Sequence, residues 1–390
     1  MAVGKLPKHK THRTTERPPF ESIALLLQGG GALGSYQGGV YEALAEANLH
    51  PDWVAGISIG AINSALIAGN PPETRVDRLR TFWEQITTPP FGVPDVTTLE
   101  IKGDLAHSLV NQVRAFAAIM GGAPTFFTPR LPPPFMQARG SSEAVSFYDT
   151  GPLLATLERL LDFDRLNAGA TRFSVGAVNV RTGNFTYFDT TTHHIGPQHI
   201  LASGSLPPGF PATEIDGEFY WDGGLVSNTP LQWVLDGSPR KDTLAFQVDL
   251  WPSAGDFPRD LAESDVRQKE IRFSSRTRYA TDQFRKAQKL RRAVDHLLKH
   301  VSHNAQTMPE IELLTEEASE KVYNIIQLIY HSKNYEGSSK DYDFSRRSME
   351  EHWRAGYNDA VRTLRHPEVL QRPKDLDGVF TFDLATQGRE

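Results

Sequence analysis

A serine between two glycines is the residue of this sequence best suited to nucleophilic chemistry. Ser58 lies in the run Gly56-Ile57-Ser58-Ile59-Gly60, after a short apolar stretch and before the Ala/Ile-rich segment 61–68. In a Gly-x-Ser-x-Gly turn that joins a strand to a helix, glycines keep Cβ atoms out of a crowded corner and the hydroxyl is exposed beside the helix N-terminus. We therefore predict that Ser58 is a nucleophile. The alternative is a tight turn whose backbone merely accommodates these residues.

A run of three glycines is the second chemical feature, and it follows the apolar stretch 24–27. This stretch and the one before Ser58 are short enough to be buried parallel strands. Loops at the carboxyl ends of neighbouring parallel strands lie side by side, so N–H groups of the glycine run can point at an oxyanion formed over Ser58. The predicted oxyanion hole consists of Gly29, Gly30 and Gly31.

The same glycines also satisfy the dinucleotide-binding pattern, as Gly29-x-Gly31-x-x-Gly34. That pattern needs an acidic residue at the end of the second strand to hold a ribose. Asp52 has the right spacing, but it precedes the apolar stretch 53–57 instead of following it. No Lys-Ser/Thr pair follows the glycines, so a phosphate loop of the Walker type is excluded. A nucleotide-binding α/β protein remains the alternative to a serine enzyme.

An aspartate in a glycine loop is the third feature. Asp222 follows a predicted strand and precedes Gly223 and Gly224. An aspartate before glycine most often bonds its own turn, and by itself this motif favours that role. Three motifs in this order resemble the signature of the patatin-like phospholipase family, however, and the resemblance covers roughly residues 23–250. The motif glycines are Gly29, Gly30, Gly31, Gly34, Gly56, Gly60, Gly223 and Gly224.

The resemblance implies a fold, a reaction and roles for residues. The fold is a three-layer α/β/α structure with a mostly parallel central sheet. The reaction is hydrolysis of lipid esters, of the phospholipase A or lysophospholipase kind, through an acyl-serine. Ser58 is the nucleophile and Asp222 the general base of a Ser-Asp dyad, without cofactor or metal. Leu33 departs from the family, which usually has Arg or Lys there. A triad with a later histidine and a non-catalytic membrane-associated module are further alternatives.

Composition sets bounds on what the protein does. The chain has 390 residues, a formal net charge of -6 and no cysteine, so disulfides and thiolate chemistry are excluded and nucleic acid is not the expected partner. No apolar run is long enough to cross a membrane, and the basic segment 1–20 lacks the apolar core of a secretory signal. We expect a cytoplasmic protein of a bacterial subgroup of the family, peripheral to membranes if it contacts them. The oligomeric state is left open.

The chain divides into three predicted parts: a basic disordered tail at 1–20, a hydrolase core at 21–252 and a mostly helical extension at 253–390 packed on the core. A Pro-rich loop at 121–147 is predicted as a lid with an acyl-contact surface or as a loop across the core. We also predict a helix at 104–120 and strands at 243–251 and 322–330. Segment 267–299 holds eleven Lys/Arg and three Asp/Glu, so it is a solvated helix face or a contact for anionic membrane.

Overall fold

The computed structural model describes residues 11–14, 16–88, 120–274, 277–301, 308–332, 336–337, 339–375 and 377–384. Within these residues the chain forms a nine-stranded sheet and a separate pair of short strands. The strands are β1 (Ser22–Leu27), β2 (Trp53–Gly56), β3 (Thr128–Pro129), β4 (Tyr148–Asp149), β5 (Arg172–Asn179), β6 (Phe185–Asp189), β7 (Thr213–Ile215), β8 (Glu218–Asp222), β9 (Thr243–Asp249), β10 (Tyr323–Ile329) and β11 (Val379–Phe382).

The large sheet has the order β11-β10-β9-β1-β2-β5-β8-β7. Its first six strands run parallel, whereas β8 and β7 are antiparallel at one end and β6 pairs antiparallel with β5. β1 lies at the centre and is buried over its whole length, as expected for a parallel strand that is covered on both faces.

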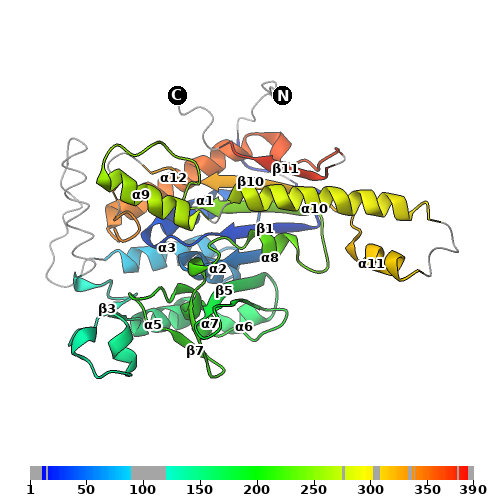
Figure 1. Ribbon diagram of the computed structural model, residues 1–390. Coiled ribbons are helices and arrows are strands. Elements are labelled where there is room, and N and C mark those ends of the chain that lie inside the picture. Colours follow the sequence, from blue (N-terminus) through cyan, green and yellow to red (C-terminus); the bar gives the residue numbers. More distant parts are fainter. Residues whose placement is uncertain are drawn as a thin grey trace.

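Helices cover both faces of the sheet, and β1 shows the two sides. Ile23, Leu25 and Leu27 belong to one apolar cluster, while Ala24 and Leu26 belong to another. The first cluster includes side chains of α1, α2, α3, α5, α7 and α12, and the second includes those of α8 and α10, which crosses in front of the strands in Figure 1. The helices are α1 (Ser35–Glu46), α2 (Ile59–Ala68), α3 (Arg75–Ile86), α5 (Gly151–Leu160), α6 (Phe163–Asn167), α7 (Pro197–Gly204), α8 (Leu231–Leu235), α9 (Leu261–Phe273), α10 (Thr277–Leu298), α11 (Pro309–Glu317) and α12 (Arg346–Leu364).

The predicted three-layer α/β/α fold with a mostly parallel sheet is confirmed. The strand predicted at 322–330 is β10, which pairs with β9, and β11 extends the sheet beyond it. The last third of the chain is helical, but it also continues the central sheet. The helix predicted at 104–120 lies outside the described residues, apart from residue 120, and so does the beginning of the basic tail, residues 1–10.

One edge of β5 determines where the two predicted catalytic loops meet. Gly56, at the end of β2, lies opposite Val175, and Asp222, at the end of β8, lies opposite Ala177. β6 occupies the other edge of β5 along this stretch, so β2 and β8 share one edge. Since β2 is parallel and β8 antiparallel to β5, the two strands run toward each other and their carboxyl ends meet.

Candidate active site

Ser58 forms the sharp turn between β2 and α2. Its φ of 56° lies in the left-handed region that side chains other than glycine rarely adopt, and it is the N-cap residue of α2. The backbone N–H of Ser58 donates to Ser203 Oγ at 2.9 Å. Strained backbone of this kind persists only where the surroundings hold it in place, and it is common at functional sites. The turn therefore has the geometry that the sequence predicted.

The glycines on either side of this turn permit very close backbone contacts. A Cβ atom at Gly56 would lie 2.2 Å from the carbonyl oxygen of Gly60, and one at Gly60 would lie 2.2 Å from the oxygen of Leu27. Two other motif glycines are similarly enclosed. A Cβ atom at Gly34 would meet Ile59, and one at Gly223 would meet the backbone of Gly176. These positions therefore exclude any larger residue.

Asp222 and Ser58 line the same cavity, and their side chains lie close enough for Ser58 to influence the pKa of the carboxyl group. The carboxyl group is almost completely buried, and its Oδ1 accepts the N–H of Gly224 at 2.7 Å. Burial raises the pKa of Asp222 to about 7, although the interactions with Ser58 and with the Gly224 N–H act in the opposite direction. A carboxylate with a pKa in this range is a far better base at neutral pH than an exposed aspartate.

The glycine loop differs from the prediction at one position. The N–H of Gly29 donates to Asn228 Oδ1 at 3.2 Å, so it does not point freely at the site. Within the described residues, the N–H groups of Gly30 and Gly31 donate to no protein acceptor, and both residues line the cavity above Ser58. Gly31 has a φ of 55°, and a Cβ atom there would lie 2.3 Å from the carbonyl oxygen of Asp341. Two of the three predicted donors remain available.

Residues that the sequence analysis missed hold this loop in place. Asn228 Nδ2 donates to the carbonyl of Gly29 at 3.0 Å and to that of Phe273 at 2.9 Å. Trp251 Nε1 donates to the Gly29 carbonyl at 3.0 Å, and Gln28 Oε1 accepts the N–H of Trp251 at 3.0 Å. These residues come from segments about 200 positions apart in sequence. No local motif marks them, so only the fold reveals their role.

The C-terminal third of the chain reaches the same loop. The carbonyl of Asp341 accepts the N–H of Ala32 at 2.9 Å, and its carboxylate lies 3.0 Å from Lys269 Nζ on α9. The next residue back, Lys340, forms an ion pair at 2.9 Å with Glu270, and both side chains are buried. Buried charges are tolerated only when paired, so these pairs fix α9 against the 340–341 segment. The glycine loop is thus clamped from outside the predicted core.

A cavity of about 450 Å³ opens above Ser58 and Asp222. Its size is in the range of ligand pockets, and its wall is mostly apolar. No Lys, Arg or His lines it among the described residues, and Leu33, at the position where the family usually has Arg or Lys, is completely buried in the core. The aromatic residues of the wall are Phe126, Phe127, Phe147, Tyr148, Phe210, Trp251, Phe273, Tyr342 and Phe344.

The Pro-rich loop supplies part of this wall. Phe126 and Phe127 are buried and contact Phe210 and Phe344, with ring centroids 5.3 to 5.9 Å apart. Other apolar residues of the loop, such as Phe135, are exposed. The loop therefore packs against the core at one end and faces solvent at the other.

The alternative sites of the sequence analysis lie elsewhere. Asp52 pairs with Arg17 and accepts the N–H of Ile23 at 2.7 Å, at the opposite end of β1 from the glycine loop. His352 lies 3.5 Å from Glu336, away from the cavity lining. Within the described part of the chain, no group of three or more His, Asp or Glu side chains could hold a metal ion.

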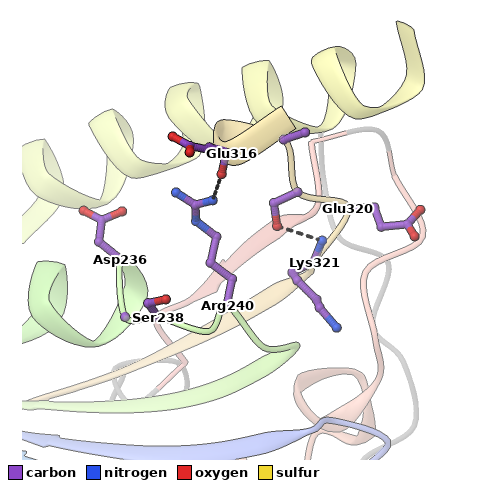
Figure 2. Close-up of a pocket in the computed structure, with 9 residues that line it drawn as sticks. Asp236, Ser238, Arg240, Glu316, Glu320 and Lys321 are labelled. Carbon is purple, nitrogen blue, oxygen red and sulfur yellow. Dashed lines mark hydrogen bonds between the residues drawn. The ribbon is translucent and has the colours of Figure 1, made fainter. Parts of the chain in front are cut away.

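A second pocket, of about 370 Å³, lies between α11 and the loop after α8 and is strongly charged. Figure 2 shows Arg240 pointing to the Glu316 carbonyl, to which it donates at 3.1 Å. Lys321, also on its wall, pairs with Glu21 at 2.8 Å. Both cations already have partners within the protein, and these contacts hold neighbouring segments together. The pocket is therefore not a candidate active site.

The fold and the site define an α/β protein with a serine and a buried carboxylate at the carboxyl ends of a mostly parallel sheet. Residues 25–235 match a family described as patatin-like phospholipase, and residues 271–376 match one described as patatin phospholipase. The first match covers more than half of the chain. The protein belongs to the patatin-like phospholipase family, and this membership supports lipid acyl hydrolase activity.

Individual relatives resemble the protein either over a short segment or over a longer range with low identity. A segment of 57 residues is 49% identical to lysophospholipase nte1 of Aspergillus terreus, and it covers 15% of this chain and 4% of that protein. VipD from Legionella pneumophila is 14% identical with a TM-score of 0.40, over 99% of this chain and 77% of VipD. ExoU in its complex with SpcU, from Pseudomonas aeruginosa, is 18% identical with a TM-score of 0.28, over 77% of this chain and 60% of that chain.

Proposed function

We propose that the protein hydrolyses carboxylic esters of lipids through an acyl-serine intermediate. Ser58 is the nucleophile and Asp222 the general base. The observation that carries this proposal is that the Ser58 and Asp222 side chains lie together in the lining of one apolar cavity, close enough for Ser58 to lower the pKa of the buried carboxyl group. A nucleophile in contact with a base whose pKa is near neutral is the arrangement that acyl transfer by serine requires.

In the first step, Asp222 takes the hydroxyl proton while Ser58 Oγ attacks the ester carbonyl carbon. The resulting oxyanion accepts hydrogen bonds from the N–H groups of Gly30 and Gly31. The N–H of Ile59 is a third candidate donor, because it belongs to the first turn of α2 and donates to no acceptor within the described residues. Each such donor contributes on the order of 10²- to 10³-fold to the rate.

The tetrahedral intermediate then collapses. The ester C–O bond breaks, Asp222 returns its proton to the leaving alcohol, and the acyl group stays on Ser58. Water enters, loses a proton to Asp222 and attacks the acyl-serine carbonyl, and collapse of the second intermediate releases the fatty acid and restores the serine hydroxyl. The absence of histidine from the described cavity wall supports a base that acts directly on Ser58.

The composition of the cavity wall indicates that a lipid acyl chain is the group that enters the cavity. Its aromatic side chains favour an apolar chain, and Asp222 and Asp341 are the only charged residues in its lining among those that the structure describes. A phosphate would meet no cation from these described lining residues, so we place a phospholipid headgroup outside the cavity and expect neutral esters to be accepted as well. Phospholipase A or lysophospholipase activity is the finer assignment that we propose.

A fluorophosphonate probe tests the nucleophile. We expect labelling of the native protein and none of Ser58→Ala. Ser64→Ala is the matched control, since Ser64 lies on the same helix and its buried hydroxyl makes no hydrogen bond within the described residues. Labelling of Ser58→Ala at the native rate would refute the proposal.

Ester hydrolysis tests the base. We expect Asp222→Asn to lose activity on a short p-nitrophenyl ester by about 10⁴-fold or more, and the double variant with Ser58→Ala to be no worse than either single variant. Asp216→Asn is the control, because Asp216 lies on the exposed turn of the same hairpin. Native activity of Asp222→Asn would contradict the role of Asp222.

A further inference from the structure

The Pro-rich loop exposes an unusual number of large apolar side chains. Leu131, Phe135 and Met136 are 88%, 81% and 68% exposed, and Val145 is 61% exposed. Single exposed apolar residues are common on soluble proteins, but several in one short segment mark a surface that binds something. The same segment continues to Phe147, which lines the cavity.

A second apolar group lies at the start of α9. Phe257 and Leu261, just before and at the start of α9, are 91% and 86% exposed. The last residue of α9, Phe273, lines the cavity, as Phe147 does. In Figure 1, α9 and the loop around β3 lie at the same end of the molecule, with α9 above the loop.

We propose that these two groups dock the protein on a lipid bilayer surface, with the cavity opening between them. We call Leu131, Phe135, Met136, Phe257 and Leu261 the apolar rim. The inference deepens the proposed function, on which its choice of occupant rests. An occupant that covers both sides of the opening also controls what enters it. A lipid surface both covers the rim and supplies acyl chains, whereas a protein partner seated there would close the entrance.

The charge around the rim points to apolar attachment. Between residues 253 and 273 there are five Asp/Glu and four Lys/Arg, and between 130 and 147 there are two Arg and one Glu. Segments with so little net charge should be attracted to anionic bilayers hardly more strongly than to zwitterionic ones. We therefore expect binding to phosphatidylcholine vesicles that persists in high salt, because burial of apolar surface is not screened by ions.

The basic segment 267–299, the membrane contact suggested by the sequence, is less suited to this task. The segment has eleven cations in its sequence, and six of those that the structure describes form ion pairs, several with acidic partners from outside the segment. Lys289 pairs with Asp377 and Arg291 with Asp236, for example. These pairs reduce the positive charge that the segment presents. No helix in the described part of the chain has both the length and the apolar character needed to cross a bilayer.

Vesicle flotation tests the rim without relying on catalysis. The experiment uses full-length Ser58→Ala protein and vesicles of phosphatidylcholine alone. Binding is compared in about 0.1 M and about 1 M salt, because the higher concentration screens electrostatic attraction. We expect the variant Leu131→Ser/Phe135→Ser/Met136→Ser to bind at least about tenfold more weakly, from the apolar area it loses. Phe257→Ser/Leu261→Ser tests the other side of the opening independently. The matched control, Lys286→Glu/Lys289→Glu on exposed α10 positions, should bind normally.

The outcomes separate the possibilities. Native binding by both rim variants would overturn the proposal, as would loss of binding in the α10 control alone or loss of all binding in high salt. A rim variant that changes the mass of the protein in light scattering would show that the rim joins two copies of the chain instead. In the Ser58-containing background, we expect the rim variants to hydrolyse a water-soluble ester normally and vesicle-borne lipid slowly. Failure of the native protein to hydrolyse either ester would refute the proposed function and leave the binding result standing.

Discussion

Replacing the buried carboxyl group of Asp222 should make the protein more stable and the effect should grow with pH. The pKa of Asp222 is about 7 in the folded protein, against an ordinary value of 3.8. The folded state therefore favours the protonated form. Asp222 contributes no penalty well below pH 3.8, where the carboxyl group is neutral in both states; the penalty grows as the pH rises from about 4 to 7 and levels off above that.

The magnitude follows from the same two values. A difference of one pKa unit corresponds to about 1.4 kcal/mol, so the ionised carboxylate costs the fold about 4 kcal/mol above pH 8. The cost at pH 5 is about 1.5 to 2 kcal/mol, because only part of the pH range between the two pKa values has been crossed. The amide of Asp222→Asn does not ionise and can still accept the N–H of Gly224. Its free energy of unfolding should therefore rise relative to the native protein by about 2 to 3 kcal/mol between pH 5 and pH 8.

Urea denaturation of both proteins at pH 5, 6.5 and 8 measures this difference. Asp216→Asn, on the exposed turn of the same hairpin, is the control for replacing an aspartate by asparagine. The reasoning fails if the stability gap between Asp222→Asn and the native protein is constant within about 1 kcal/mol, or if it narrows toward pH 8. A widening gap in a variant without esterase activity would mean that the site maintains its base at the expense of stability.

Three further outcomes are expected. The value of kcat/KM on a soluble ester should fall about tenfold per pH unit below pH 7, since Asp222 must be ionised to act as a base, and a plateau that extends to pH 5 would contradict this. Asn228→Ala should lower kcat by about 10²-fold with little change in KM, because the Gly29 loop loses its clamp, and an unchanged kcat would show that the loop holds itself. Lys269→Met should lower kcat on the order of tenfold, because it leaves the Asp341 carboxylate beside Gly31 without its ion pair. Adding Asp341→Asn should restore most of the lost kcat. If kcat does not recover, the loss comes from disturbed packing instead.

Local patterns were sufficient to predict the elements that carry the motifs. The apolar stretch before Gly29 and the Ala/Ile-rich segment after Ser58 form the predicted strand and helix. Their periodicity and glycine positions are properties of short segments, which sequence reveals directly. That Ser58 lies near Asp222 was predicted from the order of the motifs and from the family resemblance. In the structure, the two residues come together because two distant strands, β2 and β8, pair with β5.

The parts that sequence did not reveal depend on long-range contacts. Asn228 and Trp251 contact Gly29 across more than 190 residues, and nothing in their neighbourhoods distinguishes them from ordinary polar or aromatic residues. The same applies to Asp341, whose carbonyl holds Ala32. Gly29 was predicted as an oxyanion donor because it belongs to the glycine run after the first strand, whereas in the structure its N–H donates to Asn228.

The position of β9 in the middle of the sheet limits how far this protein can be shortened. A fragment that stops at residue 252 would contain every motif glycine, Ser58 and Asp222, yet it would leave β9 with an open edge where β10 had been. Bare parallel edges invite association between molecules. Anyone seeking a minimal version of this protein should therefore keep the strands that come last, although they lie outside the recognisable core.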